Sequence, residues 1–319
     1  MKELLNYYYG FDLFDYMKVS DGYLIMYKGK KYHFYRINNL STAYRKKELL
    51  RILEKNVYMN SLIKNRMNSL FTYDGNNYYA MFRINVDFNK KINFNEIVLF
   101  YQLINGSKVV DKKDFKYWIE LWSNKIDYLE RFLNKYYNSS FAIMCIANYY
   151  IGMGENAIEY LRLYMTNYNS EVFTAFLHNR INISNFLFDL YNPFNIVVDS
   201  KTRDISEYIK SLCFNKKEMQ NIIKNIIQRT NFSEAEYVLL VARVVFPTFF
   251  FDIFETTSFD NVLSNNKILE WNDYIFKYEE LINLVIDNIN NIKKTNLVRF
   301  DWVDKVNQFA WLPLLQVFH

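Results

Sequence analysis

The local sequence pattern changes after residue 85 of this 319-residue chain, and that change limits the fold most strongly. Residues 1–85 alternate short apolar runs with turn signals such as Ser20-Asp21-Gly22, which are typical of β-hairpins. Residues 86–319 carry long segments with apolar residues at helical spacing. The sequence therefore predicts an α+β protein with a small antiparallel β-rich lobe at 1–85 and a large, mostly helical lobe at 86–319.

The predicted elements of the N-terminal lobe follow a β-β-β-α-β-β order behind one short helix. The helix covers 2–9, the strands cover 16–19, 23–27, 32–37, 69–73 and 78–84, and a second helix starts near Ser41. Further helices are predicted at 93–103, 113–137, 141–165, 207–212, 217–229, 233–245 and 274–292. Short β-like runs at 186–188 and 196–198 flank a turn that contains Asp189 and Pro193.

Charged residues are spread along the chain, with 39 Lys and Arg against 34 Asp and Glu. A nucleic-acid-binding protein needs a concentrated basic face, and the basic runs 45–47 and 293–294 are too short to form one. The 28 Tyr and 28 Phe accompany many Asn, Ile and Lys residues, whose codons are rich in A and T. We therefore predict no nucleic-acid partner, and we do not interpret the tyrosine clusters as ligand-stacking surfaces.

Two isolated cysteines, Cys145 and Cys213, favour a reducing compartment over a disulfide-bonded scaffold. The N-terminal residues lack the apolar core and cleavage site of a signal peptide. The longest apolar stretch, 237–254, is interrupted by Arg243 and Pro247, so it is predicted to be a buried helix and turn. We expect synthesis in the cytoplasm and no membrane span.

The polar residues of segment 176–209 are spaced as in a phosphotransferase site. The segment reads FLHNRINISNFLFDLYNPFNIVVDSKTRDISEYI. It resembles the catalytic region of aminoglycoside phosphotransferases and spore-coat kinase-like proteins, where a His-Gly-Asp-x-x-x-x-Asn loop precedes a hairpin and a metal-binding Asp. His178 and Asn185 match the ends of that loop, and Asp199 matches the metal-binding position. The resemblance implies a protein-kinase-like bilobal fold; an unrelated helical fold is the alternative.

Phosphoryl transfer needs an Asp that accepts the hydroxyl proton, and the corresponding position in this chain is Arg180. Arginine is not deprotonated at physiological pH, so it cannot act as a general base. The neighbouring glycine of the motif is also replaced, by Asn179. We therefore predict that the degenerate loop 178–185 has no catalytic residue. Arg180 could instead pair with Asp199 or Asp204, or bind a phosphate.

The remaining ligand positions of such a site are also weakly preserved. Asn185 and Asp199 could hold Mg²⁺ as vestigial ligands or simply stabilise the fold, and His178 is expected to brace the backbone. Arg36 stands where a phosphate-binding Lys would be expected, with Glu48 or Glu54 as its partner on the next helix. We expect that no cofactor is required, and vestigial binding of ATP and Mg²⁺ is left open.

Two segments ahead of the loop resemble the spore-coat-associated CotS/YutH type of kinase-like protein. They contain Trp118-Ile119-Glu120-Leu121-Trp122 and a run from Tyr150 to Ala157 with Gly152 and Gly154. The alternative is that the two tryptophans form one buried helix face, while the glycines permit close helix packing.

The resemblance implies an inactive pseudokinase that acts as a binding or assembly factor in spore coat formation. Its partners would be other proteins such as spore coat components, and it would move from the cytoplasm to the spore coat. The alternative function is a small-molecule phosphotransferase that uses Mg-ATP in a rearranged active site. In that case a relocated base is expected among Asp189, Asp199 and Asp204.

Overall fold

The computed structural model describes residues 1–12, 14–19, 21–53, 58–87, 89–105, 111–134, 141–166, 170–213, 219–256 and 265–300. The chain forms two compact units: the first comprises 1–108 and 176–198, and the second comprises 109–175 and 199–319. Loop 178–185 therefore belongs to the same unit as the N-terminal strands. The lobe boundary predicted at residue 85 was drawn from local patterns, which carry no information about such a return of the chain.

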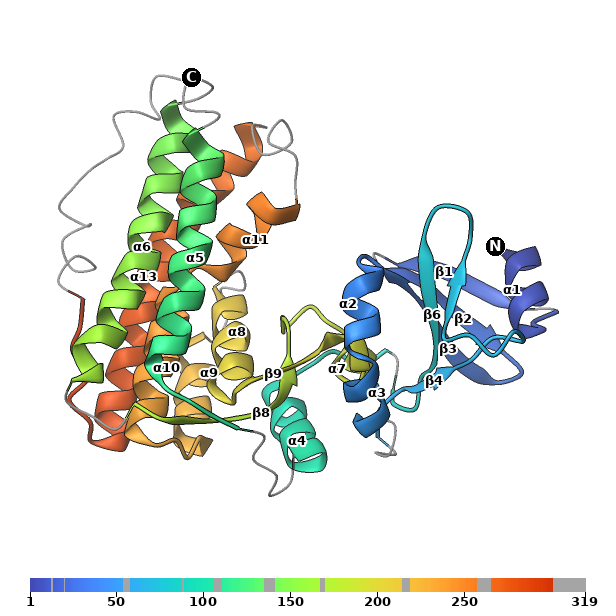
Figure 1. Ribbon diagram of the computed structural model, residues 1–319. Helices are drawn as coiled ribbons and strands as arrows, with labels where there is room; N and C mark the ends of the chain where they lie inside the picture. Colours follow the sequence, from blue (N-terminus) through green and yellow to red (C-terminus); the bar gives the residue numbers. More distant parts are fainter. Residues whose placement is uncertain are drawn as a thin grey trace. The chain divides into compact units, whose positions relative to one another are not determined.

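The first unit is built on a six-stranded antiparallel sheet, coloured blue to cyan in Figure 1. Its strands lie in the order β1-β2-β3-β6-β4, and β5 pairs with β6. Their bounds are β1 (Asp15–Val19), β2 (Gly22–Tyr27), β3 (Lys30–Ile37), β4 (Ser61–Ile63), β5 (Phe71–Tyr73) and β6 (Tyr78–Arg83). The predicted hairpins are confirmed, whereas β4 was not predicted, because three residues carry no readable alternation.

Helices at the edges of this unit follow local signals. Helix α1 (Lys2–Tyr9) has the predicted bounds and ends at Gly10, whose φ of 73° is the left-handed conformation that glycine adopts most easily. The helix predicted from Ser41 is divided into α2 (Leu40–Arg45) and α3 (Lys47–Leu53).

Aromatic side chains fill the core of this sheet. Phe34 is fully buried and stacks on Tyr79, with 4.4 Å between the ring centroids. Phe11 stacks on Tyr27 at 4.3 Å, in the same cluster as Leu5. These phenylalanines and tyrosines therefore serve as packing residues.

The region after loop 178–185 differs from its prediction. The run Phe186–Phe188 is not a strand: Phe186 makes one isolated bridge with Lys91, and α7 (Leu187–Leu190) follows. The β prediction is wrong here because the Asp189 carboxylate accepts a hydrogen bond from the Phe186 amide at 3.1 Å, which starts a helical turn. The short helix η1 (Pro193–Asn195) and β9 (Ile196–Ser200) come next, and β9 confirms the second predicted run.

Strand β9 belongs to a second, three-stranded sheet with the order β7-β8-β9. The other two strands of this sheet were not predicted from the sequence. They are β7 (Asp111–Lys113) and β8 (Val172–His178), which pair in antiparallel fashion. Strand β8 is buried at most positions, so its sequence lacks the apolar–polar alternation of a half-exposed strand. In the first unit, α4 (Phe94–Asn105) matches its prediction closely.

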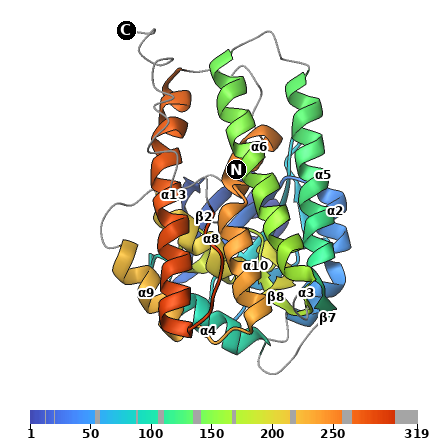
Figure 2. The same cartoon turned by 90° about the vertical axis from the view of Figure 1, so that its left-hand side faces the viewer.

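The second unit consists mainly of long helices. Its helices are α5 (Phe115–Asn134), α6 (Phe141–Met165), α8 (Thr202–Leu212), α9 (Met219–Arg229), α10 (Glu234–Val245), α11 (Thr248–Thr256) and α13 (Asn265–Lys293). Helices α5, α6, α10 and α13 run side by side (Figures 1 and 2). Helix α10 is buried from Ala235 to Val245, and a reciprocal cap between Ser233 and Glu236 fixes its start.

Helix α5 shows why its tryptophans are spaced as they are. Trp118 and Trp122 are both buried, and Trp122 stacks on Phe246 at 4.8 Å. Gly154 of α6 faces Ile126 of α5 so closely that a Cβ at this position would lie 3.1 Å from its side chain. Helix packing therefore accounts for the tryptophans and for Gly154. It does not account for Gly152, where an added Cβ would meet no described atom within 4 Å. None of the helices in the described ranges is long and apolar enough to cross a membrane.

Candidate functional site

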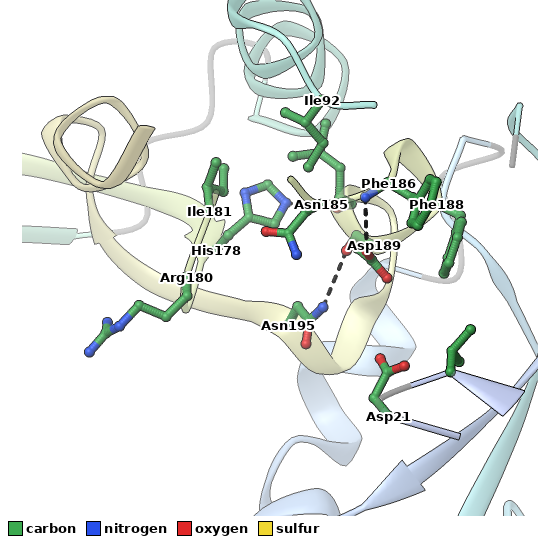
Figure 3. Close-up of a pocket in the computed structure, with 12 residues that line it drawn as sticks. Asp21, Ile92, His178, Arg180, Ile181, Asn185, Phe186, Phe188, Asp189 and Asn195 are labelled. Carbon is green, nitrogen blue, oxygen red and sulfur yellow. Dashed lines mark hydrogen bonds between the residues drawn. The ribbon is translucent and has the colours of Figure 1, made fainter. Parts of the chain in front are cut away.

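A small pocket in the first unit is lined by four of the eight residues of the degenerate loop 178–185. It is lined by His178, Arg180, Ile181 and Asn185 from the loop, by Phe186, Phe188, Asp189, Leu190 and Asn195 after it, and by Val19, Asp21 and Ile92 (Figure 3). Its volume is about 150 Å³. Pockets that enclose drug-sized ligands measure roughly 300–1,000 Å³, so this one accommodates an ion with water or a small group.

His178, the last residue of β8, is a structural residue of this pocket. Its side chain is buried, and its Nε2 lies 2.7 Å from the backbone oxygen of Leu190. The Phe100 ring packs against the imidazole with 4.2 Å between centroids. The backbone amide of Asn179 donates to the oxygen of Asn195 at 2.7 Å. These contacts tie the start of the loop to the turn that follows α7, the bracing role expected for this histidine.

Arg180, at the position of the lost aspartate, forms part of the pocket wall and is partly exposed. Its Nη1 donates to the backbone oxygen of Asn179 at 2.8 Å. Figure 3 shows its side chain extending away from Asn185 and Asp189. The guanidinium is thus turned from the interior of the pocket, and it supplies no proton acceptor there.

Asn185 closes the other end of the loop. Its side-chain oxygen accepts a hydrogen bond from the amide of Asn182 at 2.9 Å, and its backbone oxygen accepts one from Ile92 at 3.0 Å. The carboxamide oxygen that would ligate a metal in this fold is therefore engaged within its own loop.

Asp199 lies near the end of β9, in the second unit, and is 3% exposed. Its Oδ1 accepts hydrogen bonds from Trp118 Nε1 at 3.0 Å, from the Ser200 amide at 2.7 Å and from Arg243. Its Oδ2 accepts one from Arg203 at 2.7 Å. Burial alone would raise the pKa of this carboxyl, but the charges of Arg243 and Arg203 hold it well below its ordinary value.

This set of donors does not fit a divalent cation at Asp199. A metal ion needs free carboxylate lone pairs, whereas three donors converge on Oδ1. Two guanidinium groups also neutralise the carboxylate and would repel a cation beside it. Asp204 lies one turn further on in α8, and its side chain is buried as well.

The predicted phosphate-binding pair of the N-terminal lobe is only partly described. Arg36 is an exposed residue of β3, and its backbone amide donates to the backbone oxygen of Asp21 at 2.7 Å. Glu48 lies in α3, but its side chain is outside the described part of the chain, as is Glu54 altogether. Lys46, in the turn between α2 and α3, contacts the segment after the loop: its Nζ donates to the backbone oxygens of Phe194 and Ile196 at 2.5 and 3.1 Å.

Lys46 was overlooked because the sequence presents it only as the centre of a basic run. Its burial lowers the pKa of its amine, which distinguishes it from a solvated surface lysine. Nothing in the local pattern signals this, since its two carbonyl partners lie 148 and 150 residues further along the chain.

Two further ionisable residues, Asp21 and His33, were also missed as site residues. Both lie close to Asp189, a residue that the sequence had marked only as a candidate base: one ligand atom from each of the three lies within 4.8 Å of the others. Burial raises the pKa of Asp189 to about 6, and the nearby charge of Asp21 adds to this shift. The sequence signals were a tight Asp-Gly turn and a histidine inside an apolar strand, both common features of ordinary proteins.

Comparisons with solved structures identify the fold. An aminoglycoside phosphotransferase from Alicyclobacillus acidocaldarius subsp. acidocaldarius DSM 446 has a TM-score of 0.52 at 10% identity, over 88% of this chain and 93% of that one. Spectinomycin phosphotransferase APH(9)-Ia gives 0.54 at 12% identity in its AMP-bound complex, over 89% and 96%. In complex with ADP and spectinomycin it gives 0.52 at 11%, over 90% and 97%.

Sequence comparison identifies the family. No curated protein matches the chain. Residues 2–276 match the family described as spore coat putative kinase YutH, which covers both units. The resemblance inferred from the degenerate loop and from the two preceding helices is thus confirmed, as is the α+β kinase-like fold. The chain therefore belongs to the spore coat YutH family and has the fold of the aminoglycoside phosphotransferases.

Proposed function

We propose that this protein is a catalytically inactive member of the phosphotransferase fold that acts as a binding and assembly factor in spore coat formation. Membership of a spore coat family supports the biological setting. The arginine at the position of the base supports the loss of chemistry, because a permanently protonated side chain cannot accept the substrate proton.

The observation that carries the proposal is the double arginine pairing of Asp199. Phosphoryl transfer depends on a divalent cation that bridges the nucleotide phosphates, and a carboxylate of this fold normally holds it. Here Arg203 and Arg243 supply the positive charge at that carboxylate. A carboxylate neutralised from within the protein serves to stabilise the fold.

The test combines nucleotide binding with turnover. We expect no transfer of γ-labelled phosphate from Mg-ATP to a panel of hydroxyl and amine acceptors. We also expect Mg-ATP to leave the melting temperature unchanged, because a ligand that binds only the folded state would raise it. Magnesium-dependent transfer that disappears in Asp199→Asn, or in Asn185→Ala if the first variant does not fold, would refute the proposal.

A second candidate function has one specific observation in its favour. Asp189 lines the pocket and has a pKa raised to about 6, near the range that suits a general base at neutral pH. A small-molecule phosphotransferase with a relocated base would therefore lose its turnover in Asp189→Asn while keeping its fold. Turnover in the wild type that persists in this variant would exclude Asp189 as the base.

The assembly role is tested in sporulating cells. A fluorescent fusion of the chain should move from the mother-cell cytoplasm to the spore coat, and Asp189→Asn should do the same, since the role requires no catalysis. Fluorescence that stays uniformly cytoplasmic throughout sporulation would contradict a role in the coat.

A further inference from the structure

A cluster of ionisable side chains in the first unit has no role in the assembly function proposed above, although one member, Asp189, is the base of the second candidate function. Asp21 lies in the turn between β1 and β2, His33 lies in the middle of β3, and Asp189 lies in α7. Their ligand atoms lie within 4.8 Å of one another. The β1–β2 turn and β3 thus bring one carboxylate and one imidazole nitrogen close to the carboxylate of Asp189, which lies more than 150 residues further along the chain.

His33 is the unusual member of this cluster. Its side chain is fully buried, and neither ring nitrogen has a hydrogen-bond partner within the described ranges. Buried polar groups nearly always have a hydrogen-bond partner, so an imidazole that contacts the Asp21 carboxylate without a hydrogen bond points to a missing ligand.

The spacing of His33 and Asp21 fits shared coordination. Nε2 lies 3.3 Å from Oδ1 of Asp21, without the geometry of a hydrogen bond. Two ligands of one tetrahedral Zn²⁺, with bonds of about 2.0–2.1 Å, stand roughly 3.4 Å apart. The two side chains are therefore already separated as two ligands of one ion would be.

The three ligand positions are held by the fold. Gly22 has a φ of 143°, and a Cβ there would lie 2.0 Å from the backbone oxygen of Phe34, so the turn that carries Asp21 requires glycine. The Phe186 amide fixes Asp189 through its hydrogen bond to Oδ2. Such outer contacts orient ligands in metal sites.

Access to the cluster comes from the pocket. Asp21 and Asp189 line it, while His33 is buried beside them. An ion bound here would have the imidazole on its protein side and an open coordination position toward the pocket, where water would complete the shell. The pocket volume of about 150 Å³ suffices for that water.

We propose that Asp21, His33 and Asp189 form a binding site for a divalent transition-metal ion, with Zn²⁺ as the preferred ion. Imidazole nitrogen suits zinc and its neighbours, whereas magnesium and calcium favour sites made of oxygen ligands alone. The ion would neutralise two carboxylates that otherwise repel each other. The site involves neither nucleotide nor catalysis, so it holds or fails separately from the proposed function.

The experiment uses the full chain without a polyhistidine tag, freed of metal with a chelator. Titration with Zn²⁺ in a calorimeter should give one ion per chain. Titration with Co²⁺ should produce the strong visible absorption of a four-coordinate ion, which octahedral Co²⁺ bound only through oxygen does not show. Zn²⁺ should also raise the melting temperature.

Variants distinguish this site from unspecific binding. His33→Phe and Asp189→Asn should each weaken Zn²⁺ binding by more than about 100-fold, because even outer partners of metal ligands contribute about 10- to 100-fold. Asp15→Asn is the matched control: it removes an exposed carboxylate of β1 in the same unit and should leave the affinity unchanged. If His33→Phe does not fold in the absence of metal, Asp21→Asn tests the same ligand set.

Two results would overturn the proposal. One is Zn²⁺ binding to the wild type no tighter than to His33→Phe or Asp21→Asn. The other is a Co²⁺ complex without the four-coordinate spectrum.

Discussion

Two aspartates of this protein, one buried and one half-buried, have opposite electrostatic surroundings. Asp199 in the second unit is held by Arg203 and Arg243, and its pKa lies well below the ordinary value. Asp189 in the first unit faces another carboxylate, Asp21, and its pKa is raised to about 6. One carboxylate is permanently neutralised by the protein, and the other is not.

This difference shows what each cluster can do. Arginine does not release its proton, so the Asp199 cluster is a fixed ion-pair network suited to holding the fold. The cluster of Asp21, His33 and Asp189 contains no permanent cation, so it can change its net charge by binding the proposed metal ion. The aspartate that the sequence predicted as a metal ligand thus lies in the fixed ion-pair network.

The strongest way to break this comparison is to remove a cation from Asp199. Arg243→Met should lower the free energy of unfolding by about 3–5 kcal/mol, because it leaves a buried carboxylate with half of its compensation. Arg243 is only 6% exposed, so water cannot easily replace it. Urea denaturation measures the change, and the double variant Asp199→Asn/Arg243→Met should recover part of it. A loss below about 1 kcal/mol would mean that the pair is not important for stability.

A third carboxyl extends the comparison to a site where burial and a tyrosine hydroxyl, among the described residues, set the pKa. Glu279 of α13 is buried and accepts a hydrogen bond from the Tyr149 hydroxyl, and burial raises its pKa to about 7. Because the folded state keeps this proton longer than the unfolded state, stability should fall as pH rises from about 4.5 to 7 and stay low above.

The size of this effect is about 3 kcal/mol for a shift of that extent. Glu279→Gln should remove the decline, so that the variant is more stable than the wild type at pH 8 and nearly equal at pH 4. Urea denaturation at both pH values tests this. Parallel pH profiles for the two proteins would show that Glu279 is not the group responsible.

Within the Asp199 cluster, the two arginines should differ. Arg203 is bonded to Oδ2 at 2.7 Å, and its side chain is 14% exposed, so water can partly solvate the carboxylate when it is removed. We expect Arg203→Met to cost about 2 kcal/mol, the scale of a hydrogen bond to a charged group. If Arg203→Met lowers the free energy of unfolding more than Arg243→Met does under the same conditions, then burial does not decide how much each arginine stabilises the fold.

A solvent-exposed ion pair should give the smallest change in the free energy of unfolding. Lys112 and Glu171 lie 3.0 Å apart, and both side chains are 52% exposed. Lys112→Met should change stability by about 0.5 kcal/mol or less, and the change should vanish in high salt. A larger effect would show that distance, and not burial, decides the value of ion pairs in this protein.

Elements with strong local signals were predicted well. Helix α1 and the first hairpins follow from Gly10, Gly22 and Gly29, each of which occupies a backbone conformation that other residues adopt only with strain. The match of His178 and Asn185 to a phosphotransferase loop also depends only on spacing along the chain. Such signals are carried by neighbouring residues, so sequence reading can recover them.

Elements with weak or conflicting local signals were missed. Strand β8 is buried at most positions on both sides, so its sequence shows no alternation. The apolar run at Phe186 has the composition of a strand, but the Asp189 carboxylate accepts a hydrogen bond from the Phe186 amide and starts a helical turn. In the site, the same limit hid Lys46, Asp21 and His33, since their partners lie on other segments.

The sequence by itself determined the α+β class, most of the helices and the family resemblance, because each depends on residue type and local spacing. It also placed an arginine at residue 180, where the resemblance predicts the base. Only the tertiary structure decided that Arg243 neutralises Asp199, 44 residues away, and that Asp21 and His33 meet Asp189. Electrostatic energy depends on distance and burial in space, and neither can be read from positions along a chain.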